Sequence, residues 1–377
     1  MALLKPFRAL RYDVRAAGPL DLLVAPPYDV ITPEELERLV SRSPFNVVRL
    51  IRPHEPELAA QRYLDWQSSG VLMREEMPAV WRLEEEFVGP DGVPRVRRGL
   101  VARVRAEPYE RGVVLPHERT FPAARAARLG LLRAVKAKLS PVFLFHQGPP
   151  PAPLERPPDI EASYEKAASR LWRVDDPAEI RAELEAVEGP FVIADGHHRY
   201  EAALRFHEEE GGTETGYVMA ALVSRADEGL TIFPTHRLLA GSVPALNGAF
   251  RLTPLAGGAV ESLERLSRVP RDHPAFVCLR PSEAVLAELP AVGDGPLDRL
   301  DVSALDRLPL EQVTFTPSAD EAERAVTAGR ASAAFLVRAP TVAEIEAVAR
   351  AGTTMPEKST YFYPKLLSGL LFSPFDE

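Results

Sequence analysis

The sequence has a single cysteine, no long apolar segment and no excess of positive charge, and each of these absences excludes a class of protein. The single cysteine, Cys278, lies in the apolar run 275–279, so an internal disulfide is excluded and a reducing compartment is expected. The N-terminus reaches Pro6 before a signal-type apolar segment develops, and no stretch approaches the roughly 18 uncharged residues of a membrane span. We therefore expect a cytoplasmic protein that does not associate with membranes.

An excess of positive charge is also missing. The 377 residues carry 45 Lys+Arg against 54 Asp+Glu, a formal net charge of -9. Nucleic-acid-binding modules typically present a basic surface, so direct binding of nucleic acid is not expected. Only six of the 45 basic residues are lysine, which together with 37 prolines indicates a GC-rich coding bias. A lysine retained against this bias is a candidate for a role that needs a compact ammonium group.

Strand and helix patterns alternate along the chain, which predicts a mixed α/β fold. Thr32 followed by Pro33 and two acidic residues is typical of a helix start. The predicted strands include 46–51, 78–87, 97–104, 140–145, 190–194, 217–223, 231–234, 275–279 and 333–337. The predicted helices include 57–69, 123–138, 175–184, 201–210, 259–266, 319–327 and 342–350. The proline-rich stretch 148–158 and the region from about 240 to 250 are the best linker candidates.

The segment 194–200, Ala-Asp-Gly-His-His-Arg-Tyr, is the most informative one for chemistry. It follows an apolar strand and opens a helix, and the backbone N–H groups of a helix N-terminus form an anion site. Two imidazoles and a guanidinium in the same turn point to phosphate as the ligand. Asp195 would repel a phosphate, and a divalent metal such as Mg²⁺ between the two resolves that conflict.

Two other interpretations of this segment remain open. In a purely structural one, the histidines cap the helix and Asp195 is its N-cap. A zinc site is the other, although adjacent histidines without cysteine do not match the usual spacing of zinc ligands.

Six motifs in order resemble a widespread prokaryotic family of proteins of unknown function, often described as relatives of the chromosome-partitioning protein ParB. They are PPYDVI (26–31), PHERT (116–120), SPVF (140–143), ADGHHRY (194–200), PTHRLL (234–239) and MPEKSTYFYPK (355–365). The DGHHR turn is also similar to turns in archaeal free serine kinases and in sulfiredoxin. The resemblance implies a ParB/sulfiredoxin-like nucleotide-binding core at 111–240, with an α/β region at 1–110 and another at 241–377.

The resemblance also implies roles for single residues. Gly196, His197, His198 and Arg199 match the phosphate-binding turn, and Asp195 matches the acid that lies beside metal and substrate in the serine kinases. The reactive cysteine of sulfiredoxin corresponds to His197 here, and Cys278 lies far away in an apolar strand. Reduction of a sulfinic acid is therefore not expected.

Glu118 and Lys136 come from the segment around PHERT. Glu118 follows a short strand, and it could deprotonate a substrate hydroxyl if burial raises its pKa toward neutrality. The alternative is an acid that caps a helix at the surface. Lys136 lies on the following predicted helix, where it either contacts a nucleotide phosphate or belongs to a solvated face.

Three further motifs supply binding candidates. In 355–365, Lys358 is expected at the phosphates or at a substrate carboxylate, or else the segment simply completes the core. Tyr28 and Asp29 are held by two prolines and suit a substrate contact or a plain turn. His236 and Arg237 follow a strand, where site residues of layered α/β folds often lie.

These observations lead to a first hypothesis, a kinase that uses ATP or ADP with Mg²⁺ to phosphorylate a serine-like amino acid or a similar metabolite. Glu118, Asp195 and His197 are the predicted catalytic residues, with Asp195 at the metal. A nucleotide-binding regulator that does not phosphorylate a metabolite is the second hypothesis. A phosphatase or hydrolase that uses His197 or His198 as general acid is the third, and each of the three is compatible with a homodimer.

Overall fold

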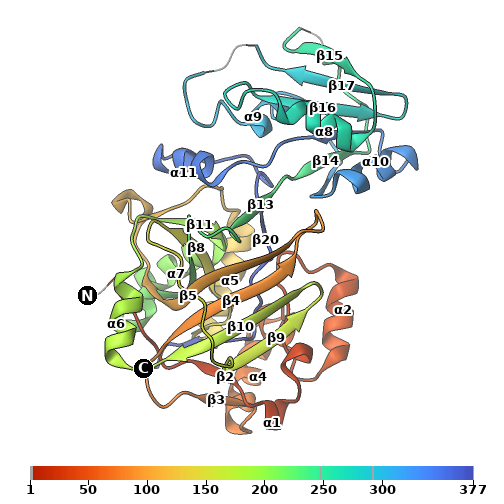
Figure 1. The fold of residues 1–377 in the computed structure, drawn as a ribbon. Helices are drawn as coiled ribbons and strands as arrows, with labels where there is room; N and C mark the ends of the chain where they lie inside the picture. Colours follow the sequence, from red (N-terminus) through yellow and green to blue (C-terminus); the bar gives the residue numbers. More distant parts are fainter. Residues whose placement is uncertain (1–2, 247, 291–292, 377) are drawn as a thin grey trace.

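A computed structural model describes residues 3–246, 248–290 and 293–376. Within these residues the largest sheet has nine strands in the order β6-β11-β8-β12-β5-β4-β10-β9, with β1 paired to β5 (Figure 1). The strands are β1 (Leu4–Lys5), β4 (Val80–Val88), β5 (Pro94–Arg105), β6 (Val114–Leu115), β8 (Val142–His146), β9 (Ile160–Tyr164), β10 (Ala167–Val174), β11 (Phe191–Asp195) and β12 (Tyr217–Ser224). Two pairs, β6 with β11 and β8 with β12, are parallel, and the other pairs are antiparallel. The predicted mixed α/β class is confirmed.

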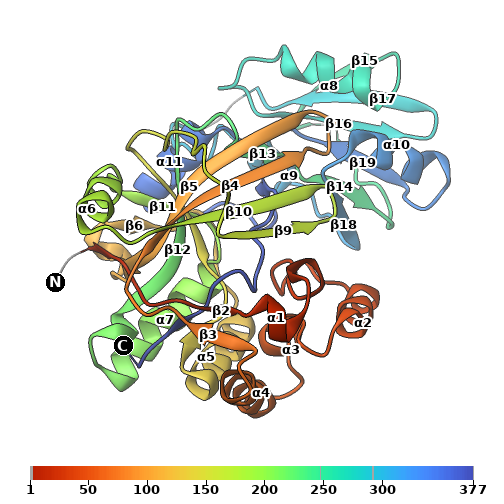
Figure 2. The ribbon, with the colours of Figure 1, turned by 60° about the horizontal axis from the view of Figure 1, so that its bottom comes forward.

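Both faces of this sheet are buried, because alternate side chains of its central strands enter different cores. On one face, Val142 and Leu144 pack with residues of α5 (Pro122–Val135) and α7 (His197–Glu210). On the other face, Phe143 and Phe145 belong to a core that includes the C-terminal segment around Phe362. Helices α5 and α7 pack against each other, and α4 (Pro56–Ser68) packs against α5 below the sheet (Figure 2).

The remaining N-terminal elements complete this larger body. They are β2 (Leu10–Tyr12), α1 (Val14–Ala17), α2 (Pro33–Arg42), α3 (Val48–Ile51) and β3 (Leu72–Arg74), with α6 (Pro177–Glu185) farther along the chain. Near the C-terminus, β21 (Ser373–Pro374) pairs with β7 (Ala137–Lys138). None of the helices in the described ranges is both long and apolar enough to cross a membrane.

A second, six-stranded sheet lies above the first in Figure 1, in the order β15-β17-β16-β19-β14-β18. Its strands are β14 (His236–Leu239), β15 (Arg251–Leu255), β16 (Ala275–Arg280), β17 (Glu283–Glu288), β18 (Val313–Thr316) and β19 (Ala333–Leu336), and its helices are α8 (Ala259–Ser267), α9 (Asp301–Leu305) and α10 (Ala319–Thr327). We call residues 236–337 the upper unit and the rest the lower body. At the junction with the upper unit, β13 (Thr231–Phe233) of the lower body pairs with β20 (Tyr361–Tyr363).

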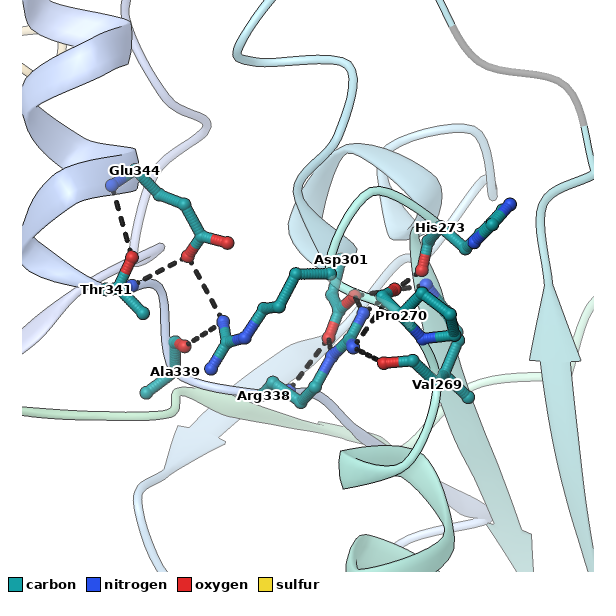
Figure 3. Close-up of polar contacts among 10 residues, drawn as sticks. Val269, Pro270, His273, Asp301, Arg338, Ala339, Thr341 and Glu344 are labelled. Carbon is teal, nitrogen blue, oxygen red and sulfur yellow. Dashed lines mark hydrogen bonds and ion pairs between the residues drawn. The ribbon is translucent and has the colours of Figure 1, made fainter.

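The chain leaves the upper unit through a segment that polar contacts hold in place (Figure 3). The guanidinium of Arg338 donates to both carboxylate oxygens of Asp301, at 2.6 and 2.9 Å, and also to the carbonyl of Val269. Arg271 of the upper unit reaches Glu344 in α11 (Val342–Arg350) at 3.1 Å. The segment 338–341 is therefore held at both ends, by the contacts of Arg338 and by the contact of Arg271 with Glu344.

Several local predictions are confirmed, and others differ from the structure. Thr32 caps α2 by accepting from the N–H of Glu35 at 3.2 Å, as its sequence pattern indicates. The predicted strand at 46–51 is wrong, because Val48–Ile51 is a short helix. The helix predicted to end at 138 ends at Val135. The nine-stranded sheet takes strands from both sides of residue 110, and the division of the chain into the regions 1–110, 111–240 and 241–377 stays a prediction.

Candidate active site

The turn from β11 into α7 provides an anion-binding geometry. Gly196 is the N-cap of α7 and has a φ of 98°, which side chains rarely tolerate, and a Cβ there would lie 3.0 Å from the Arg199 guanidinium. Among the described residues no side chain caps this helix. Because the first N–H groups of a helix lack partners within it, the turn can bind a negatively charged group.

Asp195 ends β11 at a point where its pairing with β8 is irregular. Its carboxylate accepts from Lys365 Nζ at 2.5 Å through Oδ1 and from Arg199 Nη2 at 2.5 Å through Oδ2. Burial acts to raise the pKa of Asp195, but the charges of Lys365 and Arg199 outweigh it and hold that pKa well below its usual range. The group is therefore a carboxylate at neutral pH, and both of its oxygens are engaged.

His197 is buried at the start of α7 against the fully buried His117. Its Nε2 accepts from the backbone N–H of His117 at 3.3 Å, so that nitrogen carries no proton. His117 Nδ1 lies 2.6 Å from the carbonyl oxygen of Ile193, which can only accept, so Nδ1 carries the proton. Burial lowers the pKa of both rings, that of His117 to about 4. Two neutral imidazoles thus connect the PHERT loop to the turn, and this geometry favours a structural role for His197.

His198 and Arg199 hold the turn in place from its other side. His198 Nε2 accepts from the N–H of Phe121 at 2.9 Å, and burial lowers its pKa. Arg199 donates to the carbonyl of Pro141 and to Asp195, while its Nε is buried without a hydrogen-bond partner among the described residues. A buried N–H that lacks a partner is costly, and this one lies against Gly196, where an added Cβ would come within 3.1 Å of it.

Glu118 is a carboxylate that the fold partly withdraws from water. Its Oε1 lies 3.5 Å from the backbone N–H of Lys358, and its backbone forms a bridge with Met355. Burial raises the pKa of Glu118, and the Lys358 N–H and the charges of Lys358 and Lys365 offset part of that rise. A raised pKa suits a group that exchanges a proton with substrate.

These side chains line one cavity of about 460 Å³, between the lower body and the upper unit. Six segments that are distant in the sequence contribute to it. They are 28–30, 118–124, 194–199, 234–235, 315–317 and 357–365, represented by Tyr28, Asp29, Glu118, Arg119, Phe121, Asp195, Gly196, His197, His198, Arg199, Thr235, Phe315, Lys358, Thr360, Tyr361 and Lys365 among others. Four cationic and four anionic side chains line the cavity, so it can both bind an anion and accept a proton.

Most of the predicted site residues therefore meet in this cavity, and three do not. His236 and Arg237 are buried within the second sheet, where His236 Nδ1 accepts from the N–H of Val337 and Arg237 lies 4.0 Å from Asp306. From the same motif, Thr235 reaches the cavity instead. Lys136 is the exposed C-cap of α5, outside the cavity.

Lys365 contacts Asp195 directly, but the site residues predicted from the sequence do not include it. It belongs to the 355–365 motif and is one of the six lysines, so the scarcity of lysine was the signal that could have identified it. His117 was also omitted, although it stands next to Glu118 in PHERT.

The expected magnesium site does not fit these side chains. The described residues contain no group of three or more His, Cys, Asp or Glu side chains that could hold a metal ion. Both oxygens of Asp195 already accept from cations, so a metal would have to displace Lys365 or Arg199. Lys365 and Arg199, and not a metal ion, therefore supply the positive charge beside Asp195.

Comparisons with known proteins give the following results. The chain is similar in structure to a mutant form of a free serine kinase in complex with AMP, with a TM-score of 0.42 and 13% identity over 69% of this chain and 86% of the other. It is also similar to a conserved hypothetical protein from Pyrococcus furiosus, with a TM-score of 0.39 and 13% identity over 71% and 92% of the two chains. None of the curated proteins matches. Residues 4–303 match the family described as "Protein of unknown function (DUF1015)", and the chain belongs to that family.

Proposed function

We propose that this protein is a small-molecule kinase of the cytoplasm that transfers a phosphoryl group from ATP or ADP to the hydroxyl of a serine-like amino acid or similar metabolite. One observation carries this: the N-terminus of α7, two lysines and a partly buried glutamate line the same cavity. A volume of about 460 Å³ lies within the usual range of small-molecule sites. The ParB/sulfiredoxin-like character of the core is part of the same proposal.

The charges around the turn support phosphate binding there. A phosphate at the N-terminus of α7 would be repelled by the carboxylate of Asp195, but Lys365 and Arg199 contact that carboxylate on both oxygens. The repulsion is thus offset by the protein's own cations. Lys358 and Lys365 also line the cavity, and in this proposal they stabilise the charge on the equatorial oxygens of the transferred phosphoryl group.

Glu118 is the proposed general base. It takes the proton of the acceptor hydroxyl while that oxygen forms a bond to phosphorus. The bond from phosphorus to the bridging oxygen of the nucleotide breaks, and ADP or AMP leaves with the electron pair. The raised pKa of Glu118 makes it a better proton acceptor than an exposed glutamate, provided that the pH keeps it ionised.

The test is a turnover assay with matched variants. The purified protein is incubated with ATP or ADP, with and without Mg²⁺, and with a panel of free amino acids and polyols, and ³¹P NMR follows the nucleotide and any new phosphate ester. Glu118→Gln is expected to lower the rate by about 100-fold or more while nucleotide still binds. Glu110→Gln, at an exposed acid outside the cavity, is the control that should retain the wild-type rate.

The outcomes separate this proposal from its rival. A phosphate ester formed by the wild type and by Glu110→Gln, and lost in Glu118→Gln, supports it. Tight nucleotide binding without turnover on any acceptor contradicts it and favours the nucleotide-binding regulator. Equal rates in Glu118→Gln and the wild type contradict the role of Glu118.

A further inference from the structure

Two phenylalanines on the wall of the cavity are exposed without a structural reason. Among the large hydrophobic side chains of the described residues, twelve are exposed, and of these only Phe121 and Phe315 are aromatic. Each is 42% exposed, and both line the cavity. Folding gains nothing from leaving such large apolar rings in water, so their shared position points to a ligand that covers them.

The two rings come from different parts of the molecule. Phe121 is the N-cap of α5 in the lower body, and its ring centroid lies 5.9 Å from that of His198 in the α7 turn. Phe315 lies on β18, the edge strand of the second sheet. Its neighbour Thr316 is buried and donates to Glu321, which fixes the strand that carries the ring.

The position of Phe121 next to His198 indicates what kind of ligand these rings meet. A nucleotide joins a planar aromatic base to its phosphates, and aromatic side chains stack on any base because every base has a π-face. The proposed phosphate turn and an exposed ring lie side by side at Phe121. An inorganic phosphate or a small acceptor alone would leave both rings uncovered.

We propose that Phe121 and Phe315 form an aromatic subsite that stacks on the base of the bound nucleotide. This rests on the proposed function, because it assumes that the phosphates lie at the α7 turn. It goes further by giving the upper unit a part in nucleotide binding. A bound base then contacts the lower body through Phe121 and the upper unit through Phe315.

Isothermal titration calorimetry with two probes tests this subsite, ADP and inorganic pyrophosphate. Pyrophosphate has the phosphates but no base, so it reports on the turn alone. Phe121→Ala and Phe315→Ala are each expected to weaken ADP binding by about 5- to 100-fold and to leave pyrophosphate binding within about twofold. Leu252→Ala is the matched control, since Leu252 is also 42% exposed and on the upper unit but does not line the cavity.

Each outcome decides a separate point. Weaker ADP binding in the Phe variants, with unchanged pyrophosphate binding and an unchanged Leu252→Ala, supports the subsite. Unchanged ADP binding in both Phe variants overturns the subsite and leaves the proposed function intact. An equal loss of ADP and pyrophosphate binding overturns it too, since the change then acts on the turn. A wild type that binds neither probe overturns the proposed function itself. Phe315→Tyr, which keeps an aromatic ring, should bind ADP like the wild type if stacking is the cause.

Discussion

Replacing Asp195 by asparagine removes the charge that holds two buried cations together. Asp195, Lys365 and Arg199 have side chains only 12%, 15% and 13% exposed, and each ion pair is 2.5 Å long. An asparagine can accept from one cation, but its NH₂ group then faces the other one. Breaking a buried pair by removing one partner costs about 3–5 kcal/mol. Residual contact with water at this site favours the lower end, so we expect a loss of about 3 kcal/mol in the free energy of unfolding.

Urea denaturation measures this loss, with Asp91→Asn as control. Asp91 contacts Arg95 at 2.7 Å but is 39% exposed, so its replacement should cost less than about 1 kcal/mol. Pyrophosphate at millimolar concentration should stabilise Asp195→Asn more than the wild type, because two cations are then without their counter-charge. If Asp195→Asn unfolds with a free energy within about 0.5 kcal/mol of the wild type, the carboxylate does not neutralise buried cations and this description of the turn is refuted.

Three other perturbations have definite expected results. Gly196→Ala places a side chain on a residue with a left-handed backbone conformation, so it should lower the free energy of unfolding by about 1–2 kcal/mol in urea denaturation and weaken pyrophosphate binding. Wild-type values for both quantities would contradict the role of the turn. Lys358→Arg should impair turnover and Lys136→Arg should not, because of these two lysines only Lys358 lines the cavity. Equal effects of the two variants in the kinetic assay would contradict this placement. His117 has a pKa of about 4 in the folded protein against 6.5 for an ordinary histidine, so the unfolded chain binds more protons between these values. The melting temperature should therefore fall as the pH drops from about 6.5 to about 4, and His117→Gln should reduce this dependence; an unchanged slope would show that another group causes it.

The local parts of the fold could be predicted from the sequence where short-range chemistry decides them. The Thr32–Pro33 helix start depends on an N-cap and a fixed proline φ. The turn at 195–199 depends on a glycine between an apolar strand and a helix. In both cases the residues that fix the geometry are adjacent in the chain, so no tertiary knowledge is needed.

The run 46–51 contains a short helix, Val48–Ile51, where the sequence pattern predicts a strand. The β-branched residues of this run favour a strand, but Asn46 accepts from the N–H of Val48 and donates to the carbonyls of Leu22 and Val24. These contacts to a segment about 22 residues earlier start a helical turn, and burial of Val48 and Ile51 then stabilises it. Tertiary contacts thus override the intrinsic preference.

Several residues of the cavity could be identified from the sequence, whereas their assembly could not. Lys365 and Asp195 are 170 positions apart, and nothing in their spacing indicates that they meet. His236 and Arg237 follow a strand as site residues often do, but that strand belongs to the second sheet, which buries them. The second sheet also brings Phe315 to the cavity, from a strand that carries no recognisable motif.

A crystal structure of the protein with bound ADP tests the central claim most directly. We expect phosphates within hydrogen-bond distance of the His197 and His198 backbone N–H groups, with the terminal phosphate between Lys365 and Glu118. Phosphates bound elsewhere in the cavity, or ADP bound outside it, would contradict the assignment of the α7 turn as the phosphate site.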